Sequence, residues 1–501
     1  MFKKLVLVLL VAAVAGLSVY LATRERIYST SSSKALDYYK QGVESLMKFY
    51  FEEGRNFMEL AVQEDPDFPL PYLFLLRMDF GDQTREQRTA WYKRLANPEE
   101  RWTPFERQLI ELATGKVESE NQDAVKQKLE QFLREHSSQM EAFYLLLPMY
   151  QQLEEDPEKL VAYYEKLHQL FPNNVQILNQ LGYFYVGLGE EEKARSAFEK
   201  YIFIRPDEAN PYDSYGEMLY NTGHFLQAQE MFQKALDRKA DFVLSSLHLS
   251  QAFMRQGKIR ESNATLDELE KQNTQLKQIP DTVAYYRYLN YLMINDQESA
   301  SHLLEQLDQM NVMDSIRYQI RIIDCFNRKD LECVAGILSK LEEKKGYGMR
   351  PDTVVQRARY LNQTGAYQES TDLLQSIHQS RLNSRFDIRL YVYYILIDNY
   401  LHLENRTEAE TLAADLPDGY REYELMRIAA KYGDMDAAAR YASKVLDHFS
   451  TADPDFVIVV EAKKYAESGH HDQDPEARQT LRWFDGSAAG PHCEYAGAGK
   501  G

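Results

Sequence analysis

Apolar side chains recur along most of the chain at the spacing of three and four residues that amphipathic helices show. In residues 174–206, Leu178 and Leu181 share a face of one predicted helix, and Phe198 and Tyr201 share a face of a second. Gly189 lies between the two stripes, where a glycine favours a turn. The pattern predicts two helices packed as a hairpin, with one apolar face left for a neighbouring element to cover.

The same pattern returns after 34 residues. Residues that recur at this interval are Gly182 and Gly216, Gly189 and Gly223, Ala194 and Ala228, and Phe198 and Phe232, with Gly257 continuing the second glycine series. Small residues on facing helices allow a close approach, and a phenylalanine fills the space between them. A repeat of this length predicts stacked hairpins, in which each unit covers the apolar face of the next.

The repeated unit resembles the tetratricopeptide repeat, whose consensus of about 34 residues asks for a large residue, Leu, Gly, Tyr, Ala, Phe, Ala and Pro at fixed positions. The first clear unit supplies Leu178, Leu181, Gly182, Tyr185, Ala194, Phe198, Tyr201 in place of the last Ala, and Pro206. The next supplies Tyr212, Tyr215, Gly216, Leu219, Ala228, Phe232 and Ala235. The resemblance implies an all-α fold, a right-handed superhelical solenoid of about ten tetratricopeptide and similar helical hairpins.

The resemblance divides the chain into segments. We expect residues 35–270 to form one tetratricopeptide array and residues 282–450 to form degenerate hairpins of the same kind. The polar stretch 271–281 has no apolar stripe and predicts a joint between them. Residues 451–501 begin with one more helical pattern and end in a Gly- and Ala-rich stretch, which predicts a C-terminal helix and a mobile tail.

The N-terminus has the pattern of a membrane segment. Residues 5–23 are a run of 19 residues without a charge, preceded by Lys3 and Lys4. Because a spanning helix needs roughly 20 apolar residues, residues 1–26 predict a single-pass membrane anchor. A signal peptide cleaved after Ala15 is the alternative. Residues 27–34 predict a polar spacer, and we expect the long acidic body after it outside the cytoplasm, in a periplasm or at a cell surface.

Composition narrows the range of partners and chemistry. The 501 residues include 58 Lys and Arg against 77 Asp and Glu, a formal charge of −19, which argues against nucleic acid as a partner. The cysteines Cys325, Cys333 and Cys493 form no paired framework and no CxxC motif. Cys325 and Cys333 straddle a predicted turn between helices and can come into contact, but we interpret them as small buried side chains.

No pattern in the sequence predicts an enzyme or a cofactor. Glycine-rich phosphate loops, HExxH and GxSxG are missing from the sequence. The best metal-like cluster is GHHDQD at residues 469–474, but adjacent histidines on a loop do not fix the geometry of a metal site. We interpret this stretch as a solvated loop that binds no metal. An enzyme or metal-dependent factor with its site in the C-terminal tail is an alternative function.

The stretch NPYDSYGEML at residues 210–219 places a carboxylate beside two hydroxyls, a combination that nucleophilic catalysis uses. We interpret it instead as the beginning of the first helix of a repeat. Asn210 predicts a helix cap, Pro211 a first helical turn, and Asp213 a favourable charge at the positive end of the helix. Asp213 and Glu217 are expected to face the groove, and Tyr215 the neighbouring helix.

In the tetratricopeptide family the first helix of each hairpin lines the concave side. Transferred by the match above, this implies a protein-binding groove formed by Gln176, Asn179, Tyr183, Val186, Asn210, Asp213, Glu217, Tyr220, Leu247, Gln251 and Met254. A surface of amides, carboxylates and aromatic rings suits an extended peptide or a partner helix. Alternatively, these side chains are hydrated helix faces without a partner. The basic residues of a chaperone-binding carboxylate clamp are not found here, since the first unit offers Tyr39 and Val43.

These patterns together predict a membrane-tethered scaffold that binds proteins or peptides through its groove. The repeat units resemble tetratricopeptide segments of bacterial envelope and sensor proteins. A secreted, soluble binding protein is another alternative, and it differs only in the fate of residues 1–26.

Overall fold

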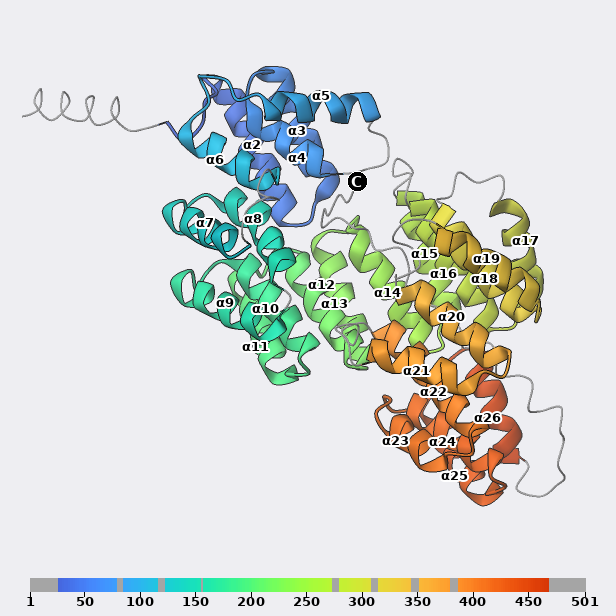
Figure 1. The fold of residues 1–501 in the computed structure, drawn as a ribbon. Coiled ribbons are helices and arrows are strands. Elements are labelled where there is room, and N and C mark those ends of the chain that lie inside the picture. The colour runs from blue at the N-terminus through green and yellow to red at the C-terminus, as the bar shows by residue number, and fades with distance from the viewer. Residues whose placement is uncertain are drawn as a thin grey trace, which may run out of the picture. The chain divides into compact units, whose positions relative to one another are not determined.

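A computed structural model of the chain describes residues 26–78, 84–115, 122–154, 156–272, 279–307, 314–343, 351–378 and 386–467. These ranges contain 25 α-helices and no strand, and Figure 1 shows the helices following one another along the chain as packed pairs. The predicted all-α fold of consecutive helical hairpins is confirmed.

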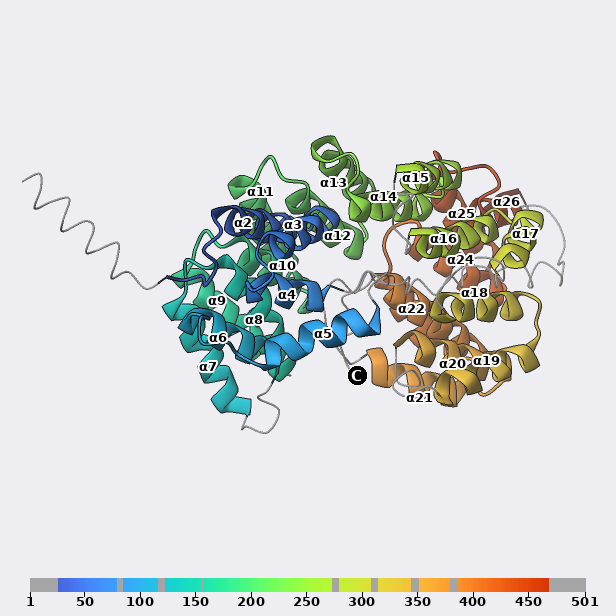
Figure 2. The ribbon, with the colours of Figure 1, turned by 90° about the horizontal axis from the view of Figure 1, so that it is seen from above.

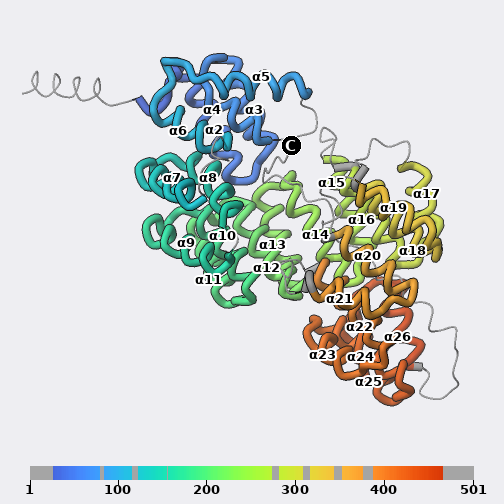
Figure 3. The backbone as a smooth tube through the Cα atoms, viewed as in Figure 1, coloured from blue at the N-terminus to red at the C-terminus, as the bar shows by residue number. Residues whose placement is uncertain are grey.

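The chain divides into two compact units, one ending at Glu155 and the other beginning at Asp156. The first unit has α2 (Ser33–Met47), α3 (Phe51–Glu64), α4 (Pro69–Arg77), α5 (Arg85–Ala96), α6 (Pro104–Ala113), α7 (Gln122–Glu135) and α8 (Met140–Leu153). The second begins with α9 (Pro157–Leu170), α10 (Val175–Gly187), α11 (Glu191–Ile204), α12 (Asn210–Asn221), α13 (Phe225–Arg238), α14 (Val243–Arg255) and α15 (Ile259–Gln272). Figure 3 traces the backbone through these hairpins.

The second unit continues with α16 (Ile279–Met293), α17 (Gln297–Leu307), α18 (Asp314–Asn327), α19 (Leu331–Glu343), α20 (Pro351–Gln363), α21 (Tyr367–His378), α22 (Phe386–His402), α23 (Arg406–Ala414), α24 (Tyr420–Lys431), α25 (Met435–His448) and α26 (Val457–Glu467). The helices α15 and α16 pack against each other. Residues 273–278 between them lie outside the described part of the chain, so the joint expected at 271–281 stays a prediction.

The segment that leads into α2 is attached to the first unit by hydrogen bonds. The hydroxyl of Tyr28 donates to Glu141 Oε1 at 2.5 Å, and the backbone N–H of Ser29 donates to Glu106 Oε1 at 2.8 Å. Both carboxyl groups are buried, and burial raises the pKa of each. Residues 27–34 were expected to be a polar spacer, but their start is packed against α6 and α8 because it supplies hydrogen-bond donors to buried carboxylates.

The repeat glycines allow the two helices of a hairpin to touch. A Cβ atom added to Gly182 would lie 2.4 Å from Cζ of Phe198, and one added to Gly216 would lie 2.5 Å from Cε1 of Phe232. Both phenylalanine side chains are fully buried. The predicted packing of a phenylalanine against a facing glycine is therefore confirmed in both units.

The glycines of the hairpin turns have a left-handed backbone, with φ of +75° at Gly189, +87° at Gly223 and +73° at Gly257. Two of them also meet residues from much later in the chain. A Cβ atom at Gly223 would lie 2.5 Å from Cγ of Pro417, and one at Gly257 would lie 2.6 Å from Cδ1 of Phe456. The turns at Gly223 and Gly257 therefore need glycine both for their backbone conformation and for the space that later residues occupy.

Polar contacts join the same two parts of the second unit. The hydroxyl of Tyr420 at the start of α24 donates to the backbone carbonyl of Arg255 at 2.8 Å. The backbone N–H of Arg260 donates to Asp453 Oδ2 at 2.9 Å, and its guanidinium also binds this carboxylate. The view in Figure 2 shows α14 and α15 together with α24, α25 and α26. The array formed by α12–α15 is thus bonded along its turns to the last helices of the chain.

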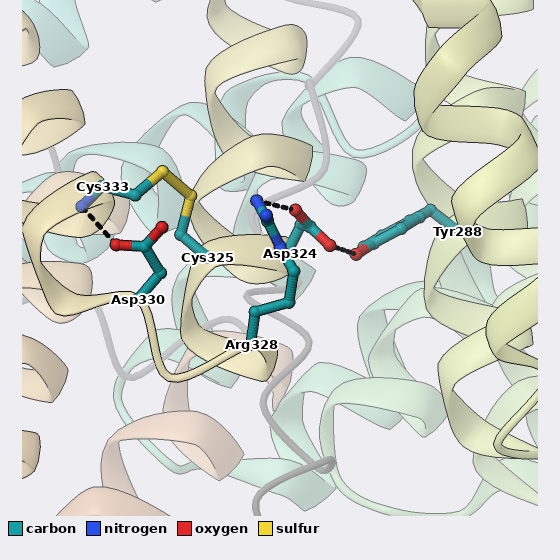
Figure 4. The surroundings of a disulfide bond; sticks show 6 residues. All are labelled: Tyr288, Asp324, Cys325, Arg328, Asp330 and Cys333. Atoms are coloured by element: carbon teal, nitrogen blue, oxygen red, sulfur yellow. Dashed lines mark hydrogen bonds and ion pairs between the residues drawn. A yellow bond between two sulfur atoms is a disulfide. The ribbon is translucent and has the colours of Figure 1, made fainter.

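A disulfide links Cys325 in α18 to Cys333 in α19 (Figure 4). The Cα atoms of the two residues are 5.9 Å apart, which lies in the range that a disulfide spans. The backbone N–H of Cys333 donates to Asp330 Oδ1 at 2.9 Å in the first turn of α19. The interpretation of these cysteines as unlinked buried side chains is wrong, because the hairpin turn brings their side chains together.

None of the helices in the described ranges is long and apolar enough to cross a membrane. The expected anchor at residues 1–26 lies, except for its last residue, outside the described residues. The GHHDQD stretch and the expected tail lie outside them as well.

Candidate functional site

The predicted groove residues lie on α10, α12 and α14, the first helices of three successive hairpins. Helix α12 contacts α10 and α14 as well as α11 and α13. It is enclosed as a result, and ten of its 12 residues are buried. Polar side chains on this helix therefore have to find partners on the neighbouring helices.

The stretch that opens α12 differs in one respect from the prediction. The N-cap residue is Ala209, and no side chain caps the helix. The backbone of Ala209 is already helical, so Asn210 lies inside the helix, where its Nδ2 donates to the hydroxyl of Tyr201 at 3.1 Å. The prediction that Asn210 caps the helix is wrong for this reason. Tyr215 does contact the neighbouring helix, since its hydroxyl accepts from Nη1 of Arg195 in α11 at 2.9 Å.

Five side chains from three helices form a hydrogen-bonded cluster around Asp213. Its Oδ1 accepts from the hydroxyl of Ser245 at 2.6 Å and lies 3.0 Å from Nδ1 of His248, both in α14. The other ring nitrogen of His248, Nε2, lies 3.6 Å from Oε1 of Glu217, one turn after Asp213. The hydroxyl of Tyr183 in α10 donates to Oε2 of Glu217 at 2.5 Å. The imidazole therefore lies between two carboxylates that α12 presents on one face.

Burial divides this cluster into an inner and an outer part. Asp213 is 1% exposed and Ser245 is fully buried, whereas His248, Glu217 and Tyr183 are half-buried. Burial and the neighbouring Glu217 carboxylate raise the pKa of Tyr183, so its hydroxyl remains a donor at neutral pH. The half-buried side chains form the part of the cluster that a ligand can reach.

The eleven predicted groove residues fall into two groups. Those that are buried are Asn179, Asn210, Asp213, Tyr220, Leu247 and Met254, and those that are half-buried are Gln176, Tyr183, Val186, Glu217 and Gln251. Tyr183, Glu217 and Gln251 occupy the same position in three successive units, 34 residues apart. We call these three residues the groove row. The groove remains a prediction, and the groove row belongs to its half-buried part, together with Gln176 and Val186.

The sequence did not single out Ser245 and His248, although both contact Asp213. The family positions transferred to α14 pointed to Leu247 and Gln251 instead. The two missed residues lie one helical turn apart, and the 34-residue period aligns them with Pro211 and Ser214 of α12. The signal available in the sequence was this polar pair on the first helix of the unit that follows Asp213.

A second buried charged group lies near the end of the chain. Nη1 of Arg427 donates to Glu424 Oε2 at 2.8 Å within α24, and the hydroxyl of Tyr423 donates to Glu461 Oε2 in α26 at 3.0 Å. Burial raises the pKa of Glu461 to about 7, although Arg427 and the Tyr423 hydroxyl oppose this effect. This group joins two packed helices through its buried carboxyl groups, so we assign it a structural role.

Helices α10 and α11 lie in the part of the chain that matches a known family. Residues 175–208, which contain α10 and α11, match the tetratricopeptide repeat family. The matched residues contain the contact between Gly182 and Phe198 and contribute Tyr183 to the cluster. The neighbouring hairpins continue this arrangement on either side.

Comparison of folds finds similar chains among solved structures. One is found in the structure described as "Crystal structure of APC/C hetero-tetramer Cut9-Hcn1". It has a TM-score of 0.44 and 13% sequence identity, over 85% of this chain and 78% of that chain. Comparison with curated proteins finds no match.

Proposed function

We propose that this protein is a scaffold that binds segments of other proteins along the first helices of its tetratricopeptide hairpins. The observation that supports this most is the groove row. Its residues Tyr183, Glu217 and Gln251 occupy the same position in α10, α12 and α14. Such a row offers one polar or aromatic contact every repeat, which suits an extended peptide or a helix laid across the hairpins. The tetratricopeptide match at residues 175–208 covers the first of these helices.

We further propose that the scaffold is tethered to a membrane and that its body lies outside the cytoplasm, within a cell envelope. The uncharged run at residues 5–23 supports the tether. The disulfide between Cys325 and Cys333 supports an oxidising compartment, because cytosolic thiols are usually kept reduced. Mass spectrometry of the mature N-terminus tests the tether, and a chain that begins at Gly16 would instead indicate a secreted protein.

The binding face is tested by site-specific photocrosslinking in native membranes. A photoreactive amino acid at Gln251 samples the groove row, and the same amino acid at Glu230, an exposed position of α13, is the matched control. We expect a discrete crosslinked partner from position 251 only, and loss of this product in E217K. The control charge reversal E230K should leave it unchanged. Equal crosslinking from both positions, or a product that E217K does not affect, would contradict the proposed face.

A further inference from the structure

Asp213, Glu217 and His248 can each place one ligand atom within 4.8 Å of the others. They are the only group of three or more His, Cys, Asp or Glu residues with this property in the part of the chain that the structure describes. We propose that these three residues bind one divalent transition-metal ion, for which Zn²⁺ has the best-matched ligand preferences. Imidazole nitrogen together with carboxylate oxygen is a donor set that Zn²⁺ accepts in proteins.

The charge of the cluster supports a bound cation. Asp213 is 1% exposed, and its partners are the Ser245 hydroxyl and the His248 imidazole. No Lys or Arg in the described ranges forms an ion pair with it. A buried carboxylate without a Lys or Arg partner is costly, and the second carboxylate at Glu217 adds to this cost. A divalent ion between Asp213, Glu217 and His248 would neutralise both charges.

A separate observation on the neighbouring helix points the same way. Asn179 in α10 is 4% exposed, and its side-chain carbonyl oxygen accepts no hydrogen bond. It occupies the repeat position that Asp213 has in α12, and it precedes Tyr183, which contacts Glu217, by one helical turn. A buried oxygen without a donor loses the hydrogen bond it would make in water. The repeat position that Asp213 has in α12 thus holds, in α10, a second buried oxygen, one that lacks a donor.

Outer hydrogen bonds orient the carboxylates as they do in known metal sites. Ser245 donates to Asp213, and Tyr183 donates to Oε2 of Glu217, which leaves Oε1 turned toward His248. Partners of this kind fix the orientation of a ligand and commonly change metal affinity by about 10- to 100-fold. Three protein ligands leave one position of a tetrahedral ion open. Water or a side chain from a bound protein can fill that position.

The inference is tested by calorimetric titration with ZnCl₂ of the full chain, first freed of metal with a chelator. His470, His471 and Cys493 are replaced in all samples (H470A, H471A and C493S), because they could bind zinc themselves. We expect this parent to bind one Zn²⁺ per chain. H248A should weaken that binding by more than about 100-fold, since it removes a ligand rather than an orienting partner, and Y183F by about 10- to 100-fold.

His224 provides a matched control. Its Nε2 lies 3.4 Å from Oε1 of Glu191 on the exposed turn of a neighbouring hairpin, so H224A removes a histidine beside a carboxylate without touching the cluster. This variant should bind Zn²⁺ as the parent does. Circular dichroism shows whether each variant keeps its helices, and E217Q, at a half-buried position, replaces H248A if that variant unfolds.

Two results would overturn the inference. One is a parent that shows no saturable binding of a single ion, and the other is equal affinity in the parent and in H248A. In either case the cluster is a hydrogen-bonded network only. The inference rests on the geometry of α12 and α14, not on the identity of a partner, so its failure would leave the proposed scaffold function intact.

Discussion

The carboxyl group of Glu461 should make the end of the chain sensitive to pH. This residue lies in α26 and is 4% exposed. Its Oε2 accepts from the hydroxyl of Tyr423 at 3.0 Å. Burial raises the pKa of Glu461 from 4.5 to about 7, although the Arg427 guanidinium and this hydrogen bond lower it in part. Glutamine at this position keeps the acceptor and removes the titration, so E461Q isolates the effect.

The sign follows from which state holds the proton more tightly. Because the folded pKa is above the unfolded value, the stabilisation is fully present below pH 4.5 and is lost as the pH rises through about 7. Each pH unit between the two values changes the free energy of unfolding by about 1.4 kcal/mol, which gives about 3 kcal/mol in total. Between pH 5.5 and pH 8 the wild-type contact of α26 should lose about 2 kcal/mol.

Hydrogen exchange measured by mass spectrometry on peptides from α24 and α26 reports this loss locally. Wild-type and E461Q chains are compared at the same pH, so that intrinsic exchange rates cancel. We expect E461Q to gain protection over the wild type by about 2 kcal/mol on going from pH 5.5 to pH 8. D436N changes an exposed carboxylate of α25 and should show no such gain. A difference between wild type and E461Q that is the same at both pH values would refute the reasoning.

Three further substitutions, the first with a matched control, test a packing contact, a disulfide and a buried hydrogen bond. G182A places a Cβ atom against Phe198 and should lower the free energy of unfolding by about 1–3 kcal/mol in urea denaturation, whereas G187A, with open space around it, should be neutral or stabilising. C333S opens the disulfide between α18 and α19 and should speed hydrogen exchange of this hairpin by an amount equivalent to about 2 kcal/mol, with no change for α12. Y28F leaves the buried carboxyl group of Glu141 in α8 without its donor. It should lower the free energy of unfolding of the first unit by about 1–3 kcal/mol, measured by urea titration with tryptophan fluorescence. An unchanged midpoint would mean that this hydrogen bond does not hold the segment.

The hairpins were predictable because their causes are local. A glycine opposite a phenylalanine and a glycine in the turn recur at one period, so Gly182, Phe198 and Gly189 define the unit from sequence alone. Asn210 shows the limit of this reasoning. It is a good capping residue, but Ala209 is already helical and Tyr201 offers a better-placed partner for the amide. The competing contact comes from the preceding hairpin, which a local rule does not include.

The cluster was only half predictable. The repeat phase placed Asp213 and Glu217 on the same face, since they are four residues apart on one helix. His248 was missed because its contact with Asp213 depends on how far α14 is rotated against α12, and repeat positions give this rotation only approximately. The bonds from Tyr420 and Asp453 to the turns of α14 and α15 were not predictable at all. They depend on small rotations added over many hairpins.

The turn between α14 and α15 can bond to the last helices only late in biosynthesis. Arg260 and Asp453 are 193 residues apart in the sequence, so the glycine turn at Gly257 leaves the ribosome long before its partners exist. At the usual rate of about 5–20 residues per second, that interval is about 10–40 s. During this time the surface at Gly257 that Phe456 later covers is exposed to solvent, and a chaperone can protect it. A nascent chain stalled before residue 450 would expose this surface, whereas the finished chain covers it with its own C-terminal helices.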